Sequence, residues 1–267
     1  MLTQAFPDSI IYDEADKEQG YWNQFKPSEG GKSISYKEKW KTLIPFLEQA
    51  SFQSYVQVLL WNISTNRYIY EVDKRDISGY DASLYLAESG MDFSMSNFHP
   101  SFFTAILVLL QRGFSYLLLN KQAVYNTIIN FDFLYKRCDG TYIHCLQQTS
   151  CIDADYNGRP ILLLNYMHDI TYLKKERTSN LVITTPEEVK WWNFNFDTNH
   201  MEPVQALSRQ EKIILTHLAN GRSSKEIARE LFISPHTIDT HRRHLLHKAN
   251  CLDTTGMITY AKLVGLL

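Results

Sequence analysis

Residues 207–250 have the sequence LSRQEKIILTHLANGRSSKEIARELFISPHTIDTHRRHLLHKAN, and this stretch predicts three helices in close succession. Two helix starts carry a capping box, Ser208-Arg209-Gln210-Glu211 and Ser223-Ser224-Lys225-Glu226. In such a box the serine oxygen and the glutamate carboxylate satisfy free backbone amides at the start of a helix. Each box is followed by apolar residues at positions that give the helix one buried stripe. Gly221 lies where the first helix should end in a left-handed residue.

The third helix starts almost immediately after the second. Ser234 is the expected N-cap, and Pro235 occupies the first helical position, where a missing amide costs nothing. Only Phe232-Ile233-Ser234 separates the second helix from the third. A gap this short forces the two helices to cross sharply, which is the geometry of a helix-turn-helix.

A helical wheel divides the third helix into two faces. With Ile238 as the origin, Leu245, Leu246 and Ala249 fall on the same side and are expected to pack against the other helices. The opposite arc carries the polar residues His236, Asp239, Thr240, Arg243, His244 and His247. Arginine can contact guanine in the major groove and threonine can touch a thymine methyl group, so this arc suits base recognition. Arg242 lies near the buried edge, so we expect it to meet a phosphate or an internal carboxylate.

The segment resembles the LuxR-type (NarL/FixJ-like) DNA-binding domain. The residues that carry the resemblance are Leu207-Ser208, Glu211, Gly221, Lys225-Glu226-Ile227-Ala228, Leu231, Ile233-Ser234, Thr237-Ile238, His241 and Lys248. The resemblance implies that the third helix enters the major groove and that a fourth helix, about Thr254 to Leu266, supports dimerisation through Met257, Ala261 and Val264. We place this domain at residues 206–267.

The expected DNA contacts divide into two groups. Asp239, Thr240 and Arg243 are predicted to read bases. The predicted phosphate contacts are Ser223, Ser224, Lys225, Thr237, His241, Arg242, His244 and Lys248. Asp239 departs from the family, whose members often carry a basic residue there. A carboxylate near phosphates reduces affinity but can accept a hydrogen bond from cytosine, so we interpret Asp239 as a residue that selects bases.

Charge is distributed unevenly along the chain. Residues 206–267 contain 9 Lys and Arg against 5 Asp and Glu, a net charge of +4. Residues 1–205 contain 18 against 24, a net charge of −6, which together give the −2 of the whole chain. A basic tail on an acidic body indicates that the tail meets an anion, and double-stranded promoter DNA is the partner that we expect, bound by a homodimer.

The body of the chain predicts an α+β domain with five strands. The expected strands are Ser54 to Asn62, Arg67 to Val72, Thr127 to Lys136, Tyr142 to Ile152, and Pro160 to Met167. Turns are expected at Ser64-Thr65-Asn66, at Asp139-Gly140 and at Asn157-Gly158. Helices are expected at Lys37 to Ala50, kinked by Pro45, and at Ser101 to Asn120, interrupted near Gly113.

Two strands, then helices, then three strands is an order that resembles a PAS sensor domain. The resemblance is carried by Ile77-Ser78-Gly79-Tyr80, Phe98-His99-Pro100, the hairpin from Lys136 to Tyr142, and His168-Asp169-Ile170-Thr171. We therefore expect a five-stranded antiparallel sheet with helices at residues 37–172, which senses a ligand or partner or mediates dimerisation. Phe102, Phe103, Phe114 and Tyr116 would line a cavity or fill a solid core, and the sequence leaves both open.

Two other segments complete the expected organisation. Residues 1–36 are polar and without sustained period, and we expect a partly disordered extension. Residues 173–205 are expected to connect the domains. Their aromatic run Trp191-Trp192-Asn193-Phe194-Asn195-Phe196 predicts either an edge strand that ties one domain to the other or a linker with anchoring aromatics.

The sequence favours no catalytic or metal chemistry. His236, His241, His244 and His247 spread too widely around their helix for the four convergent ligands of a zinc site. His99 and His168 have no nucleophile or second ligand at a recognisable spacing, and the four cysteines form no CxxC pair. We expect no enzyme activity and no cofactor.

The sequence-based hypothesis is a sequence-specific transcriptional regulator. Without a signal-peptide pattern or an uninterrupted apolar run of about 18 residues, a cytoplasmic location is expected. Two alternatives stay open: a quorum-type receptor gated by a small signal such as an acyl-homoserine lactone, and a protein-interaction adaptor. The Trp/Tyr/Asp constellation of the acyl-homoserine lactone receptors is absent at matching positions. The target sequence, the sense of regulation and the signal are left undetermined.

Overall fold

A computed structural model describes residues 40–174 and 177–267, and its dominant feature is one eight-stranded antiparallel sheet. The strand order is β2-β1-β5-β4-β3-β6-β7-β8. The strands are β1 (Val56–Asn62), β2 (Arg67–Val72), β3 (Ile128–Lys136), β4 (Tyr142–Ala154), β5 (Pro160–Asp169), β6 (Asn180–Thr184), β7 (Val189–Asn195) and β8 (His200–Pro203). The expected extension at residues 1–36 lies outside the described residues.

All five predicted strands are present, and they form one continuous part of the sheet. The three predicted turns are confirmed by the hairpins β1–β2, β3–β4 and β4–β5. Asn66, Gly140 and Gly158 each take a positive φ at those turns. The predicted count of five strands was wrong, because β6, β7 and β8 continue the sheet beyond β3.

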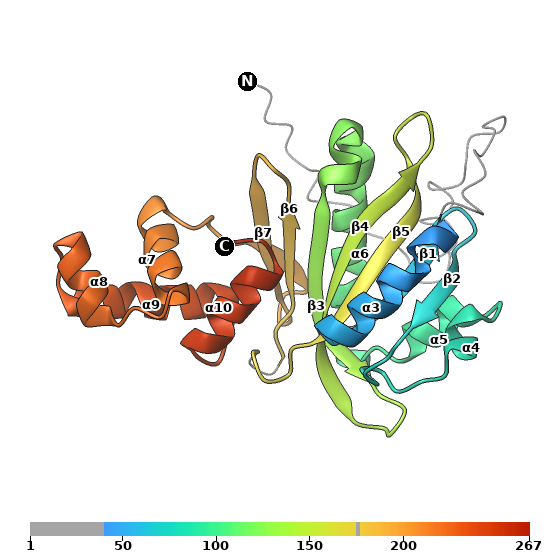
Figure 1. Cartoon of the computed structure of the whole chain (residues 1–267), viewed down its shortest axis with the longest axis horizontal. Coiled ribbons are helices and arrows are strands. Elements are labelled where there is room, and N and C mark those ends of the chain that lie inside the picture. Colours follow the sequence, from blue (N-terminus) through green and yellow to red (C-terminus); the bar gives the residue numbers. More distant parts are fainter. Residues whose placement is uncertain (1–39, 175–176) are drawn as a thin grey trace.

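Helices cover both faces of the sheet (Figure 1). The 3-10 helices are η1 (Trp40–Leu43), η2 (Pro100–Phe102) and η3 (Lys121–Asn126). The α-helices before the last strand are α3 (Ile44–Ser54), α4 (Ala82–Leu86), α5 (Gly90–Ser96) and α6 (Phe103–Leu119). The C-terminal helices are α7 (Arg209–Ala219), α8 (Ser224–Leu231), α9 (Pro235–Ala249) and α10 (Thr254–Leu263).

Two expected helix defects do not occur. Pro45 stands in the first turn of α3, where its missing amide breaks no hydrogen bond, so it starts the helix rather than kinking it. Gly113 does not interrupt α6. It is buried, and a Cβ there would lie 2.9 Å from the Ile129 side chain, so glycine allows α6 to approach β3 closely.

Side chains alternate between the two faces of the sheet and supply two separate cores. On β3, Phe131 and Phe133 face a core shared with α6, whereas Asp132 faces the opposite side. On β7, Trp192 joins the same core as Phe131, while Trp191 packs into the core of the C-terminal helices. The aromatic run is therefore a strand inside the sheet, with one tryptophan in each core.

The segment Pro100–Leu119 qualifies the expectation that no stretch could span a membrane. It has 20 residues and a mean hydropathy of 1.7, so it is long and apolar enough to cross a membrane by length and composition alone. Half of that stretch is buried inside the fold, where α6 packs on β3 and β6. Core helices of folded domains share the same length and composition, so the helix is weak evidence for a membrane span.

The end of α10 packs on the outer face of the sheet through a chain of three polar groups. The Nε2 of His168 donates to the Oε1 of Gln148 at 2.8 Å, and the Nε2 of Gln148 donates to the carbonyl of Leu263 at 2.6 Å. Burial disfavours the charged imidazole and lowers the pKa of His168 to about 4. His168 is therefore neutral in the folded protein at neutral pH.

This shift predicts a loss of stability under mild acid. The pKa of His168 in the folded protein lies below the 6.5 of the unfolded chain, so the unfolded chain binds a proton at higher pH. The free energy of unfolding therefore falls by about 1.4 kcal/mol per pH unit as the pH falls from about 6.5 towards 4. We expect wild type to lose about 2 kcal/mol more than His168→Gln between pH 7.5 and 5 in urea titrations. Parallel losses in the two proteins would contradict a neutral buried His168.

Candidate nucleic-acid interface

The helices α7, α8 and α9 form the predicted helix-turn-helix. Both capping boxes are present: Ser208 with Glu211, and Ser223 with Glu226. Gly221 ends the first of these helices with φ +77°, as its position predicted. The hydroxyl of Ser234 accepts a hydrogen bond from the amide of Thr237 at 3.0 Å and so caps α9. Local sequence signals thus set each helix boundary.

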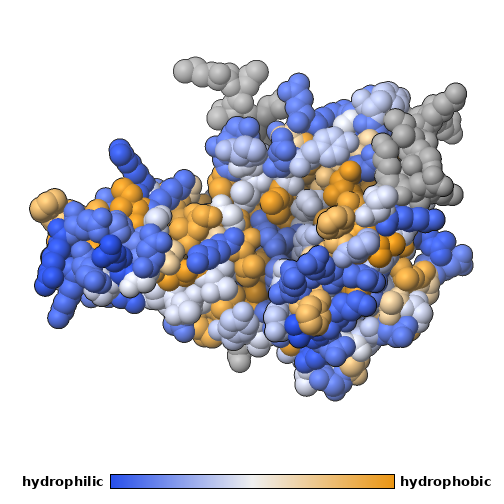
Figure 2. All heavy atoms as spheres, viewed as in Figure 1, coloured by the Kyte–Doolittle hydropathy of each residue, from blue (hydrophilic) through white to orange (hydrophobic). Residues whose placement is uncertain are grey.

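The two faces of α9 agree with the helical wheel. Ile238, Leu245 and Ala249 are buried, and Leu246 packs against the same core while partly exposed. The opposite arc contains the exposed residues His236, Asp239, Arg243, His244 and His247, with Thr240 partly exposed. Figure 2 shows mostly hydrophilic side chains at the end of the molecule where α8 and α9 lie. The recognition arc therefore faces solvent and is free of the sheet.

The predicted base-reading residues lie together on this arc. One guanidinium nitrogen of Arg243 donates to the Thr240 hydroxyl at 3.1 Å, and that hydroxyl donates to the carbonyl of His236 at 3.0 Å. These contacts orient Arg243 while leaving its side chain exposed. Asp239 is also exposed, but one of its oxygens already accepts a hydrogen bond from Ser224 at 2.8 Å.

Arg242 belongs to an internal network. Its guanidinium donates to the hydroxyls of Ser224 at 2.8 Å and Thr254 at 2.9 Å, and it lies 3.7 Å from Asp239. An internal carboxylate is thus within ion-pair distance of Arg242, and its contact with phosphate stays a prediction. The network connects α8, α9 and the start of α10, so it holds the polar arc of α9 in position.

Lys248 requires a correction. It was predicted to contact phosphate, but its Nζ donates to both carboxylate oxygens of Glu211 at 2.9 Å, and its side chain is 18% exposed. Burial would raise the pKa of Glu211, but the hydrogen bonds from Lys248 and Ser208 outweigh burial and lower it. Lys248 therefore joins α9 to α7 and is directed inward rather than to a backbone of DNA.

The remaining predicted phosphate contacts lie at or near the helix starts and along α9. Ser223 and Lys225 are exposed, and Ser224 and Thr237 are partly exposed. His241 and His244 have ring centroids 6.5 Å apart, and with His247 they line a shallow hollow of about 360 Å³ beside Glu211 and Lys248. Within residues 40–174 and 177–267, no group of three or more His, Cys, Asp or Glu side chains is arranged to hold a metal ion.

The sequence reasoning missed other cations near these helices. Arg209, Lys212, Arg222 and Arg229 are all exposed on α7, on α8 or between them. Only the basic composition of the tail indicated these residues. They add positive charge to the surface of the C-terminal helices.

The expected dimer face of α10 is not free. Met257, Ala261 and Val264 are each 2% exposed or less, because they pack into the core that the C-terminal helices share with Leu146, Val182 and Trp191 of the sheet. The family resemblance implied that these three residues support dimerisation, and that role stays a prediction. In this arrangement the sheet of the same chain occupies that side of α10.

Comparison with known proteins identifies the C-terminal helices. Residues 205–261 match the family described as "Bacterial regulatory proteins, luxR family". The chain is 47% identical over 60 residues to the uncharacterized transcriptional regulatory protein YhcZ of Bacillus subtilis, covering 22% of this chain and 28% of YhcZ. It is 36% identical over 92 residues to the oxygen regulatory protein NreC of Staphylococcus aureus, covering 34% of this chain and 40% of NreC. The C-terminal module is a LuxR-family helix-turn-helix domain.

These relatives resemble only part of the chain, which spans 28% to 40% of their length. Among solved structures, a VqmA–ligand–DNA complex from Vibrio cholerae covers 83% of this chain and 85% of that chain at 14% identity, with a TM-score of 0.31. An RNA-binding light-oxygen-voltage receptor covers 54% of this chain and 36% of that chain at 17% identity, with a TM-score of 0.35. At these TM-scores neither likeness bears on function.

Proposed function

We propose that this protein is a sequence-specific DNA-binding transcriptional regulator and not an enzyme. The observation that carries the proposal is the exposed polar arc of α9, which follows a capped α8 across a three-residue turn in a LuxR-family domain. The helix α9 enters the major groove, where Thr240 and Arg243 read bases. The protein acts in the cytoplasm as a homodimer on twofold-related promoter sites.

Arg243→Ala tests base reading. Loss of a bidentate contact to guanine is expected to cost about 1–3 kcal/mol on the preferred site and to relax specificity at one base pair. Genome-wide footprinting should therefore lose its specific peaks. Arg67→Ala, which removes the same charge from β2 far from α9, should leave the map unchanged. An unchanged map for Arg243→Ala would overturn the assignment of α9 to the groove.

Lys225→Ala tests phosphate contact at the start of α8. Its exposed ammonium supplies charge without base information, so binding should weaken by a similar factor on every sequence. The slope of log affinity against log salt should fall by about 1. Titration of labelled specific and random duplexes over a range of salt concentrations measures both quantities. A loss confined to one sequence would instead assign Lys225 to base reading.

We retain sensing of a small polar ligand as the function of the PAS-like part, because its core contains buried polar groups. Gln57 donates to Glu71 at 2.8 Å, and its Oε1 has no hydrogen-bond partner among the described residues. The hydroxyls of Tyr85 and Tyr135 lie 3.2 Å apart. Burial raises the pKa of Glu71 to about 7. Native mass spectrometry of the whole protein tests this, since a retained small molecule would support a ligand-gated receptor. A protein retained in its place would support an adaptor.

A further inference from the structure

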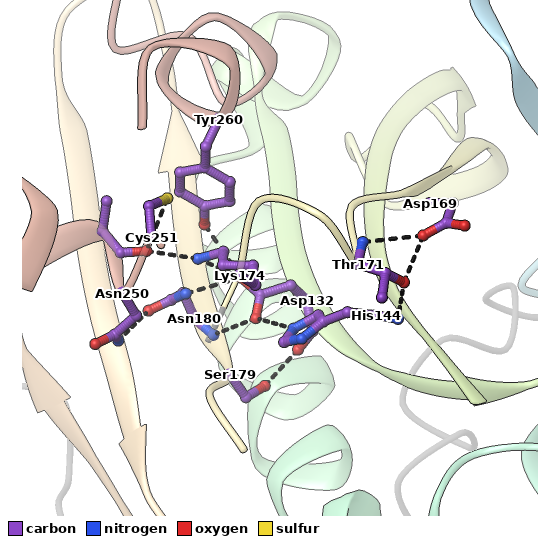
Figure 3. A network of polar contacts seen from close by, with 11 residues as sticks. Asp132, His144, Asp169, Thr171, Lys174, Ser179, Asn180, Asn250, Cys251 and Tyr260 are labelled. Carbon is purple, nitrogen blue, oxygen red and sulfur yellow. Dashed lines mark hydrogen bonds and ion pairs between the residues drawn. The ribbon is translucent and has the colours of Figure 1, made fainter. Parts of the chain in front are cut away.

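A buried ionic cluster lies where the sheet meets the C-terminal helices (Figure 3). Its centre is Asp132 on β3, whose side chain has no exposed surface. One carboxylate oxygen lies 3.2 Å from the Nζ of Lys174, and the other lies 3.0 Å from the Nε2 of His144. Lys174 follows β5, and its side chain is also fully buried. Two opposite charges are thus enclosed at the contact between the two parts of the chain.

The C-terminal helical domain supplies partners to both charges. The hydroxyl of Tyr260 on α10 donates to Asp132 at 3.2 Å. The Nζ of Lys174 donates to the carbonyl of Ala249 at 2.7 Å and lies 3.6 Å from the centroid of the Tyr260 ring. The amide of Asn250 donates to the side-chain oxygen of Asn180 at 3.3 Å. Separation of the domain from the sheet would break all of these contacts.

The carboxylate of Asp132 is strongly held in its charged form. Burial opposes ionisation, but the nearby ammonium of Lys174 and the hydrogen bonds from His144 and Asn180 outweigh it and lower the pKa of Asp132 to about 2. Asn180 donates to the carboxylate from its side chain at 2.8 Å and from its backbone at 3.3 Å. Each of the two carboxylate oxygens has at least two donors, which is the condition under which a buried charge is tolerated.

The surroundings of the cluster are apolar and tightly packed. Leu146, Val182 and Trp191 of the sheet share one core with α7, α9 and α10. A Cβ on Gly256 would lie 3.3 Å from the backbone of Leu173, so α10 approaches this segment closely. An apolar contact would hold two such surfaces together at least as well, because desolvation offsets most of the attraction in a buried ion pair. A buried ion pair differs from an apolar contact because water stabilises its two charges once the surfaces separate.

We propose that the Asp132 cluster is a releasable joint between the sheet and the C-terminal helical domain. The intact ion pair holds the domain in the arrangement of Figure 1. Loss of one partner leaves an unpaired buried charge, which frees the domain as a folded unit that turns about residues 204–207. Release exposes the side of α10 that contains Gly256 and Tyr260. The polar arc of α9 is exposed when the domain is docked, so the joint controls the placement of that arc rather than access to it.

Lys174→Met in the 267-residue chain tests the joint, because it keeps an unbranched side chain up to Cε and leaves Asp132 without its cation. Amide hydrogen exchange in residues 252–264 is expected to rise tenfold or more at pH 7.5, with exchange in α8 and in β1 unchanged. Small-angle scattering should show a larger radius of gyration. Lys262→Met, the same change on the exposed side of α10, should alter neither quantity.

A second variant separates release from general unfolding. The double change Asp132→Asn with Lys174→Met removes both charges, keeps an amide beside Asn180 and Tyr260, and should restore slow exchange in α10. If Lys174→Met alone unfolds the chain, Tyr260→Phe removes a single hydroxyl and should raise exchange in α10 selectively. The proposal would be overturned if Lys174→Met showed the exchange and scattering of wild type. It would also be overturned if the double change failed to restore slow exchange, or if Tyr260→Phe raised exchange throughout the chain. None of these readouts involves DNA, so they stand apart from the proposed function.

Discussion

Gly90→Ala is expected to destabilise the sheet domain by about 3 kcal/mol or more. A Cβ on Gly90 would lie 1.8 Å from the carbonyl oxygen of Tyr85 and 2.6 Å from its carbonyl carbon. Both atoms belong to the backbone of α4, so no side-chain rotation relieves the overlap. Tyr85 also contacts Tyr135 in the core, which means that a shift of α4 disturbs β3. Urea unfolding followed by tryptophan fluorescence measures the loss.

Gly140→Ala is the control for this prediction. Gly140 has φ +85°, but no atom of the described residues lies within 4 Å of the position that a Cβ would take. Only the cost of a left-handed alanine remains there, which is about 1–2 kcal/mol. Equal losses in the two variants would show that the contact between α4 and α5 tolerates a methyl group.

Glu211→Ala is expected to destabilise the LuxR-type domain by about 3 kcal/mol. Glu211 is 6% exposed and has two roles. It completes the capping box of α7 by accepting a hydrogen bond from the amide of Ser208, and it forms an ion pair with Lys248. Its loss removes a helix cap and leaves an ammonium largely buried without a partner. Thermal unfolding followed by circular dichroism at 222 nm checks this expectation.

Glu226→Ala provides a matched comparison, because Glu226 holds the same position in the capping box of α8. Glu226 is exposed and has no cation within ion-pair distance among the described residues, so its loss should cost less than half as much. A second variant, Lys248→Met, should lose less stability than Glu211→Ala because it preserves the cap. If both glutamate variants lose the same stability, the ion pair contributes nothing and Lys248 is again available for phosphate.

The strands β1 to β5 show how much of a sheet a local sequence pattern can predict. The five predicted strands have long runs of apolar and β-branched residues, and two of their turns contain Asp-Gly or Asn-Gly, so their pairing could be predicted. By contrast, β6 and β8 have 5 and 4 residues. Strands this short show no clear period. The strand β6 forms because the edge of β3 offers unpaired backbone groups, and β8 forms in the same way on the edge of β7. Their existence depends on tertiary structure.

The candidate site divides in the same way. The arc of α9 could be predicted because helical periodicity alone decides which residues share a face. The partners of Lys248 and Asp239 could not, because Glu211 and Ser224 stand on other helices and meet α9 only through the crossing angles. This is why a lysine predicted to contact phosphate proved to be internal.

The helix-turn-helix follows from local sequence signals. Its caps, its left-handed glycine, its three-residue turn and the two faces of α9 all depend on residues at most a few positions apart. The position of that domain on the sheet depends instead on contacts between residues far apart in the chain. Asp132, Lys174 and Tyr260 are separated by 42 and 86 residues, and none belongs to a motif. They meet because β6, β7 and β8 extend the sheet beyond β3 and α10 packs against its face. At such a contact a buried charge without a partner would cost too much free energy.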